Sequence, residues 1–149
     1  MKRKVSSMGS NRITHLGLYL CLTAMTLGLA ACNQAPEITE NDIEIIDDIG
    51  LVDLLDQEPD TVIVDVRQDF RYRLGHLPGA IHIPLPELHP DDPRFVDVEH
   101  VVVYGDGLRN TLSHAAAKKL LAGGNLLVSD FRGGFDLWKR NDHPIITSN

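Results

Sequence analysis

The sequence predicts an α/β domain built on a small, mostly parallel sheet with helices around it. Short β-branched apolar runs alternate along the chain with stretches of helical spacing, which is the pattern of βαβ units. These runs are nearly continuous, as expected of strands that are buried on both faces of a parallel sheet. With 149 residues, the chain has room for one ordinary domain.

The expected strands are short. Residues 43–46 fit an edge strand, and residues 51–55 fit a short helix that follows it. Further apolar runs predict strands at residues 61–64, 80–83, 101–104 and 126–129. Four of the eight prolines crowd residues 84–95, so this stretch is expected to be a stiff and mostly irregular connection.

The strongest helical pattern covers residues 111–122, where apolar residues recur every four positions. Asn110 or Thr111 can cap the start of this helix, and the glycine pair at residues 123–124 ends it. A helix placed between the last two strands completes the βαβ pattern.

The first 32 residues indicate an export signal. A basic region with four Lys or Arg residues precedes an apolar run over residues 13–32. Its last residues, Leu29-Ala30-Ala31-Cys32, resemble the lipobox of bacterial lipoprotein signal peptides. The resemblance implies cleavage before Cys32, acylation of Cys32 and anchoring in membrane lipid. An uncut transmembrane anchor is the alternative, because the run is also long enough to span a bilayer.

These features divide the chain into a signal peptide (1–31), an acylated cysteine with a polar tether (32–42) and a folded domain (43–149). The predicted location is the bacterial cell envelope, lipid-anchored. Where the host has an outer membrane, the absence of Asp at position 33 resembles the pattern sorted to that membrane, with the domain facing the periplasm.

The charge pattern excludes nucleic acid as a partner. The chain carries a formal net charge of −7, and without residues 1–31 it keeps 10 basic and 21 acidic residues. Such a field repels polyanions. The two cysteines, Cys21 and Cys32, both lie before the folded domain, which excludes a disulfide scaffold and a CxxC metal site there.

Four segments in order resemble the rhodanese-like domain family. They are Val62–Arg67, similar to a strand ending in Asp-x-Arg; Gly75–Pro84, similar to GHIPGA-x-x-IP; the strand Val101–Tyr104; and Phe131–Trp138, similar to GG-x-x-x-W. The resemblance spans about residues 43–146. It implies the rhodanese-like fold, a small parallel sheet flanked by helices.

Several residues of these segments are expected to be structural. Asp65 and Arg67 at a strand end favour an ion pair or a turn cap. His76 lies in a turn and favours a hydrogen-bonded support, and Trp138 favours a core anchor on a terminal helix.

No metal site and no cofactor are expected. His82, His89 and His100, with Asp91 and Asp92, could suggest metal ligands, but they do not have the spacing of a known ligand motif.

Active members of the family carry a Cys-x-x-Gly-x-Arg loop between this strand and the next helix, in which a thiolate takes up sulfur. Here the loop is Gly105, Asp106, Gly107, Leu108 and Arg109. It contains no cysteine, so no catalytic residue is assigned. Asp106 adds negative charge where an anionic substrate would lie, whereas Arg109 is a candidate anion-binding residue.

The position of the absent cysteine is ambiguous in the sequence. Counting back from Gly107 and Arg109 places it at Tyr104. Counting forward from the strand places it at Gly105, with a loop one residue shorter.

We therefore expect a membrane-anchored, catalytically inactive rhodanese-like lipoprotein that acts as a binding or regulatory module. Its partner would be an envelope protein or a small anion at the loop. The alternative is a sulfurtransferase-like enzyme or a hydrolase that uses a non-cysteine mechanism at residues 105–109. A structural remnant without a ligand is also compatible with the sequence.

Overall fold

Five parallel strands form one sheet in the order β1-β5-β4-β2-β3. The computed structural model describes residues 42–124 and 127–148. The strands are β1 (Glu44–Ile46), β2 (Val62–Asp65), β3 (Ile81–His82), β4 (His100–Tyr104) and β5 (Leu127–Phe131). The predicted parallel sheet is confirmed, and β1 is the expected edge strand.

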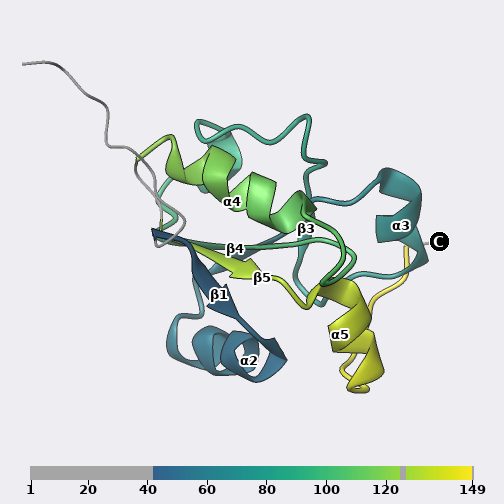
Figure 1. Cartoon of the computed structure of the whole chain (residues 1–149). Coiled ribbons are helices and arrows are strands. Elements are labelled where there is room, and N and C mark those ends of the chain that lie inside the picture. The colour runs from purple at the N-terminus through teal and green to yellow at the C-terminus, as the bar shows by residue number, and fades with distance from the viewer. Residues whose placement is uncertain (1–41, 125–126, 149) are drawn as a thin grey trace, which may run out of the picture. The chain divides into compact units, whose positions relative to one another are not determined.

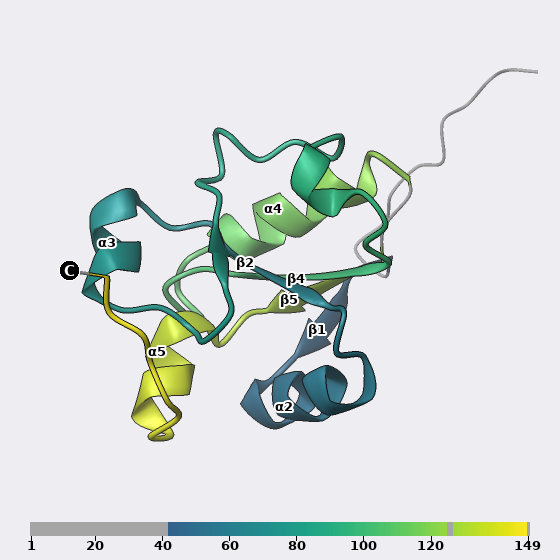
Figure 2. The same ribbon diagram turned by 180° about the vertical axis from the view of Figure 1, so that it is seen from behind.

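Helices cover both faces of the sheet. Figure 1 shows α4 (Leu112–Leu121) on one face, and α2 (Asp48–Gln57) and α5 (Gly134–Arg140) on the other. A short 3-10 helix, η2 (Pro93–Phe95), interrupts the proline-rich connection that the sequence predicts to be irregular. The remaining helix, α3 (Asp69–Leu74), lies beside the C-terminal end of the chain in both Figure 1 and Figure 2.

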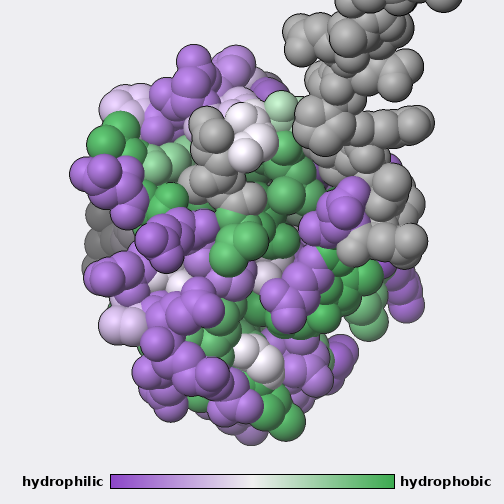
Figure 3. Space-filling view, turned by 90° about the vertical axis from the view of Figure 1, so that its left-hand side faces the viewer, coloured by the Kyte–Doolittle hydropathy of each residue, from purple (hydrophilic) through white to green (hydrophobic). Residues whose placement is uncertain are grey.

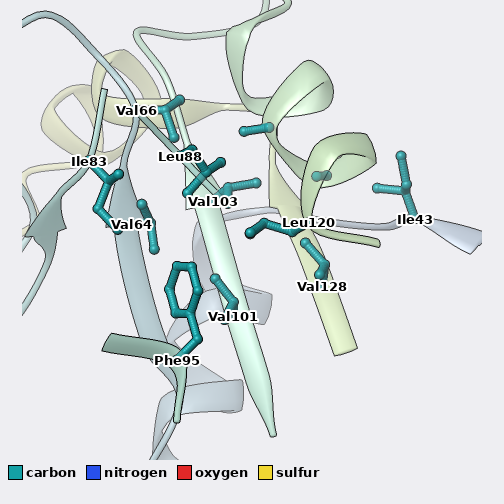
Figure 4. Close-up of a cluster of buried hydrophobic side chains, with 12 residues drawn as sticks. Ile43, Val64, Val66, Ile83, Leu88, Phe95, Val101, Val103, Leu120 and Val128 are labelled. Carbon is teal, nitrogen blue, oxygen red and sulfur yellow. The ribbon is translucent and has the colours of Figure 1, made fainter. Parts of the chain in front are cut away.

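Two hydrophobic cores lie on opposite faces of the sheet. The α4-side core includes Leu88 and Phe95 from the proline-rich connection (Figure 4). The opposite core contains Leu51 of α2 and Trp138 of α5. Trp138 is thus the predicted core anchor on the terminal helix, and its indole N–H also donates to the Pro144 carbonyl over 2.7 Å.

The central strand, β4, contributes alternately to the two cores. Val101 and Val103 point to the α4 side, whereas Val102 and Tyr104 point to the α2/α5 side. This is the two-residue period of a β-strand. The alternation determines which way the first loop residue after β4 faces.

The start of α4 agrees with one of the two predicted caps. The Asn110 side-chain oxygen accepts from the Leu112 backbone N–H over 3.0 Å, whereas Thr111 forms no side-chain cap. The Asn110 side chain thus closes the loop that precedes the helix.

Helix α3 has no clear signal in the sequence pattern. This helix has six residues and none of them is buried, so neither its length nor an apolar face stabilises it alone. The chain end helps to hold it: the Ser148 N–H donates to the Arg73 carbonyl, and His76 and Ile146 exchange two backbone hydrogen bonds of 2.9 Å.

Within the described ranges, no helix is both long and apolar enough to cross a bilayer. The predicted signal peptide (1–31), Cys32 and the tether up to residue 41 lie outside the residues that the structure describes.

Candidate functional site

The predicted loop lies at the carboxyl end of the sheet, between β4 and α4. It borders a cleft of about 690 Å³, whose other walls are Arg71 of α3 and Asp136, Leu137 and Arg140 of α5. Loops at the carboxyl ends of parallel strands are the usual place for binding sites in open α/β folds. The structure thus joins the predicted loop to residues of two helices that the sequence did not connect with it.

The two positions that the sequence offers for the family's cysteine, 104 and 105, face opposite ways. Tyr104 is the last residue of β4 and is fully buried on the α2/α5 side. A Cβ atom at Gly105 would instead face the start of α4, 3.6 Å from Leu112 Cβ and 3.6 Å from the Ser113 nitrogen. The start of a helix favours negative charge, so position 105 is the one where a thiolate side chain would be stabilised.

Tyr104 belongs to a buried polar network. Its hydroxyl donates to Asp65 Oδ2 over 2.6 Å and accepts from the Leu77 N–H over 3.2 Å. Burial, followed by the nearby Asp65 charge, raises the pKa of Tyr104 far above its ordinary value. Tyr104 is therefore a neutral structural residue.

Asp65 and Arg67 form the predicted ion pair. Arg67 donates from Nε and Nη2 to the Asp65 carboxylate at 2.6–3.1 Å, and Nη2 also donates to the Gly75 carbonyl. Burial by itself lowers the pKa of the Arg67 guanidinium, but its hydrogen bonds and opposite charges more than offset this and raise it. The pair connects β2 to the turn at Gly75.

Two glycine positions hold the loop against α5. Gly134 has a φ of +59°, and a Cβ atom there would lie only 2.5 Å from the Gly105 carbonyl oxygen. The Phe135 N–H donates to the Gly105 carbonyl and the Asp136 N–H donates to the Asp106 carbonyl. Gly107 leaves room for Asp136, whose Cβ would be 3.2 Å from an added Cβ. The start of α5 therefore fixes the backbone of residues 105–107.

Asp106 is surrounded by donors. Its Oδ1 lies 3.5 Å from Arg71 Nη1 and 3.9 Å from Arg67 Nη1, and its Oδ2 accepts from the Asn110 amide over 3.0 Å. The Asp106 side chain is 25% exposed at the edge of the cleft. The negative charge that the sequence placed in the loop is thus paired within the protein.

Arg109 and Leu108 lie on the outer part of the loop. Both are exposed, with Leu108 at 71%. Arg109 shares the cleft with Arg71 and Arg140, so three guanidinium groups and the carboxylates of Asp106 and Asp136 line it. A lining with both signs of charge is complementary to a surface that bears both acidic and basic groups.

His76 occupies the support position predicted for it. Its Nδ1 contacts the Tyr72 carbonyl over 2.9 Å, and its ring stacks on Tyr72 with centroids 3.8 Å apart. His82 stacks on the other face of Tyr72 at 4.6 Å. The two imidazoles stack on Tyr72 and so hold α3, the helix that carries Arg71 to the cleft.

His100 lies at the opposite, amino end of the sheet. Its Nε2 contacts Ser129 Oγ over 2.8 Å, its Nδ1 contacts Glu58 over 2.8 Å, and Ser129 donates to Glu44 over 3.1 Å. His82 lies beside α3, at the other end of the sheet from His100. Within residues 42–124 and 127–148, no group of three or more His, Cys, Asp or Glu side chains could hold a metal ion.

Sequence reasoning did not identify Arg71, Asp136 and Arg140 as site residues. They lie on α3 and α5, far from the loop in the chain. The only nearby feature of the sequence is the pair of arginines at residues 71 and 73. Nothing in the sequence indicates that α3 lies beside the loop.

Residues 50–141 match the model of the rhodanese-like domain family. The match includes β2 to β5, the 105–109 loop, and Gly107 and Gly134, the two glycines that hold the loop against α5. It agrees with the order of segments in the sequence and with the five-stranded parallel sheet.

Solved structures are similar to this domain. A crystal structure of the Alr3790 protein from Anabaena sp. is 29% identical with a TM-score of 0.58, covering 69% of this chain and 80% of that chain. A protein of unknown function from Rhodopseudomonas palustris, named as a possible tyrosine phosphatase, is 28% identical with a TM-score of 0.62, covering 71% and 86%. Thiosulfate sulfurtransferase from Pseudomonas aeruginosa shares the fold at 22% identity and a TM-score of 0.62, covering 74% of this chain and 21% of that chain.

Proposed function

Because the chain belongs to the rhodanese-like domain family, we propose that it is a lipid-anchored member that binds a partner at the 105–109 loop without turning over a substrate. The family fold provides the scaffold, and the cleft beside the loop provides the contact surface. The partner is an envelope protein or a small anion.

One observation carries this proposal: Gly105 stands where a nucleophile would face the start of α4. A glycine has no side chain to attack a sulfur or phosphorus atom, and residues 33–149 contain no cysteine that could replace it. The nearby Ser113 is buried, and Tyr104 is directed into the opposite core. Covalent catalysis needs an accessible activated nucleophile, which this loop does not supply.

The proposed anchor is acylated Cys32, in the cell envelope and, where the host has an outer membrane, in that membrane with the domain facing the periplasm. Residues 33–41 could extend to about 30 Å. The domain begins at the amino end of β1, whereas the cleft lies at the carboxyl end of the sheet. Residue 42 and the cleft therefore lie at opposite ends of the sheet.

The first test is an activity assay of the full chain in detergent, beside an active rhodanese. We expect background rates with thiosulfate and cyanide, and with p-nitrophenyl phosphate. A sulfurtransferase or phosphatase rate clearly above background would contradict the proposal.

The competing function is an enzyme that uses Asp106 instead of cysteine. In that case the full chain would show turnover, and Asp106→Ala and Arg109→Ala would each abolish it. Under the binding proposal these two variants have the same background rate as the unaltered chain, and only partner capture changes.

Anchoring is tested by Cys32→Ser. We expect this variant to lose acylation and to leave the membrane fraction, whereas Cys21→Ser keeps both because Cys21 lies within the predicted signal. Normal acylation of Cys32→Ser would refute the lipoprotein assignment.

Partner binding is tested by photo-crosslinking in cells. A photoreactive residue at Leu108 is compared with one at Leu127, which is similarly exposed (71% and 64%) but lies at the amino end of the sheet. We expect a discrete crosslinked product from position 108 that Arg109→Ala weakens, and none from position 127. Equal products from both positions would contradict a binding site at the loop.

A further inference from the structure

The Asp106 carboxylate occupies a position suited to an anion from outside the protein. Two guanidinium groups, from Arg67 and Arg71, and one amide, from Asn110, converge on its oxygens. Guanidinium and amide donors of this kind are what oxyanion sites in proteins use. The three donors come from the end of β2, from α3 and from the start of α4, so the fold, not the local sequence, brings them together.

Arg67 directs one of its guanidinium nitrogens toward this position. Its side chain is only 2% exposed, and the Asp65 carboxylate and the Gly75 carbonyl satisfy Nε and Nη2. The remaining nitrogen, Nη1, is directed toward Asp106. Asp65 balances the charge of Arg67, so what Arg67 adds at this position is a directed donor, Nη1, that an oxyanion can meet.

The backbone holds Asp106 in place. Its carbonyl accepts from the Asp136 N–H over 2.8 Å, and the Gly134 contact fixes the preceding residue. The carboxylate therefore cannot leave the three donors by a movement of the loop backbone unless the contact with α5 breaks.

We propose that the Asp106 carboxylate is an internal ligand of a latent oxyanion site formed by Arg67, Arg71 and Asn110, and that it keeps free oxyanions out of this position. Any second anion would have to approach within a few ångströms of Asp106, and two like charges at that distance repel each other strongly. Replacing the carboxylate by a neutral side chain leaves the donors in place and removes the repulsion, and a smaller side chain also vacates the position.

This inference deepens the proposed function and rests on it for the statement that the loop binds rather than catalyses. It narrows the partner to one class. The Asp106 carboxylate fills the anion position, so a free inorganic anion is excluded as the partner. The partner is then an envelope protein that contacts the outer residues of the cleft, such as Arg109 and Leu108.

The experiment measures binding of inorganic phosphate to the full chain in detergent by titration calorimetry. Asp106→Asn removes the charge at constant size, and Asp136→Asn is the matched control, because Asp136 lines the same cleft without an ion pair to Arg67 or Arg71 among the described contacts. Asp106→Ser is a second variant in case the first does not fold, and circular dichroism monitors folding.

We expect the folded Asp106 variants to bind phosphate at least about tenfold more tightly than the unaltered chain. Asp136→Asn should behave like the unaltered chain, and adding Arg71→Ala to Asp106→Asn should remove the gained binding. Equal phosphate affinity in the unaltered chain, or no gain in either folded Asp106 variant, would overturn the inference. Turnover in the activity assays would instead refute the proposed function and leave this binding result to be judged separately.

Discussion

The two ends of the sheet differ in the charged residues that line their clefts. At the carboxyl end, three arginines and two aspartates line the cleft, and Asp106 is paired with Arg67 and Arg71. At the amino end, a second cleft of about 460 Å³ is lined by Glu58, Asp60, Asp97 and Glu99 with no Lys or Arg among its lining residues. Figure 3, which faces this amino end, shows hydrophilic side chains interspersed with apolar areas.

This difference shows that the net charge of the whole chain does not describe the charge at the cleft. The formal charge of −7 is a property of the whole chain, whereas the cleft beside the loop is lined by arginines and aspartates together. Uncompensated surface carboxylates contribute to solubility. At the cleft, the charge of the local arginines is partly balanced by neighbouring aspartates.

Both ends contain a buried polar network, but only one contains a buried ion pair. At the carboxyl end Asp65 and Arg67 form that pair, and at the amino end His100 and Ser129 form hydrogen bonds with two carboxylates. If this distinction governs stability, substitutions at the carboxyl end should lower the free energy of unfolding more than substitutions at the amino end.

The largest effect is expected for Arg67→Ala. It leaves the Asp65 carboxylate buried without its partner, which should lower the free energy of unfolding by about 3–5 kcal/mol. Arg71→Ala is the control, because Arg71 is 52% exposed and its ion pair should be worth less than about 1 kcal/mol. Urea denaturation compares the two, and similar losses would show that burial of the pair does not matter.

The next effect concerns the contact between the loop and α5. Gly134→Ala adds backbone strain and a clash with the Gly105 carbonyl, and should cost about 2–4 kcal/mol. Gly79→Ala has similar strain, with a φ of +75°, but an added Cβ meets nothing within 4 Å. It should cost about 1 kcal/mol. Thermal unfolding measures both, and a smaller loss for Gly134→Ala would contradict the loop–helix contact.

At the amino end, Ser129→Ala removes the hydroxyl between His100 and Glu44. The loss of these hydrogen bonds should cost about 1–2 kcal/mol. Chemical denaturation gives the value, and the activity and phosphate-binding measurements at the opposite end should not change. An effect as large as that of Arg67→Ala would remove the distinction between the two ends.

The smallest effect is an acid sensitivity at the carboxyl end. Hydrogen bonds from Asn141 and then His143 lower the pKa of Asp48 below its usual value of 3.8. A lowered folded-state pKa stabilises the protein above the unfolded-state value, and the contribution disappears as the pH falls through the folded-state value. From about pH 5 to about pH 2, the unaltered chain should therefore lose more stability than Asp48→Asn, by about 1 kcal/mol or less. Urea titrations at both pH values measure this difference, and equal losses would contradict it.

Much of the fold was predictable because its signals are local. The β-branched runs, the four-residue spacing in α4 and the Asp65–Arg67 pair all lie within short segments, and the structure confirms them. The loop position was also predictable, but the choice between Tyr104 and Gly105 was not. It depends on which face of the sheet the last strand residue occupies, and only the packed cores show that.

The remaining site residues could not be predicted, because long-range packing brings them to the loop. Arg71 reaches the cleft since α3 is held by stacking of Tyr72 between two imidazoles. The His100–Ser129 contact joins residues 29 positions apart. Neither arrangement has a pattern of spacing in the sequence.

The C-terminal segment beside α3 has a consequence for the lifetime of the site. A helix without a buried residue opens easily, and here the backbone bonds of Ile146 and Ser148 help to close it. Deletion of residues 146–148 should therefore speed amide hydrogen exchange in α3 while leaving β4 protected. The backbone bonds of this short segment would then set how long Arg71 stays at the cleft.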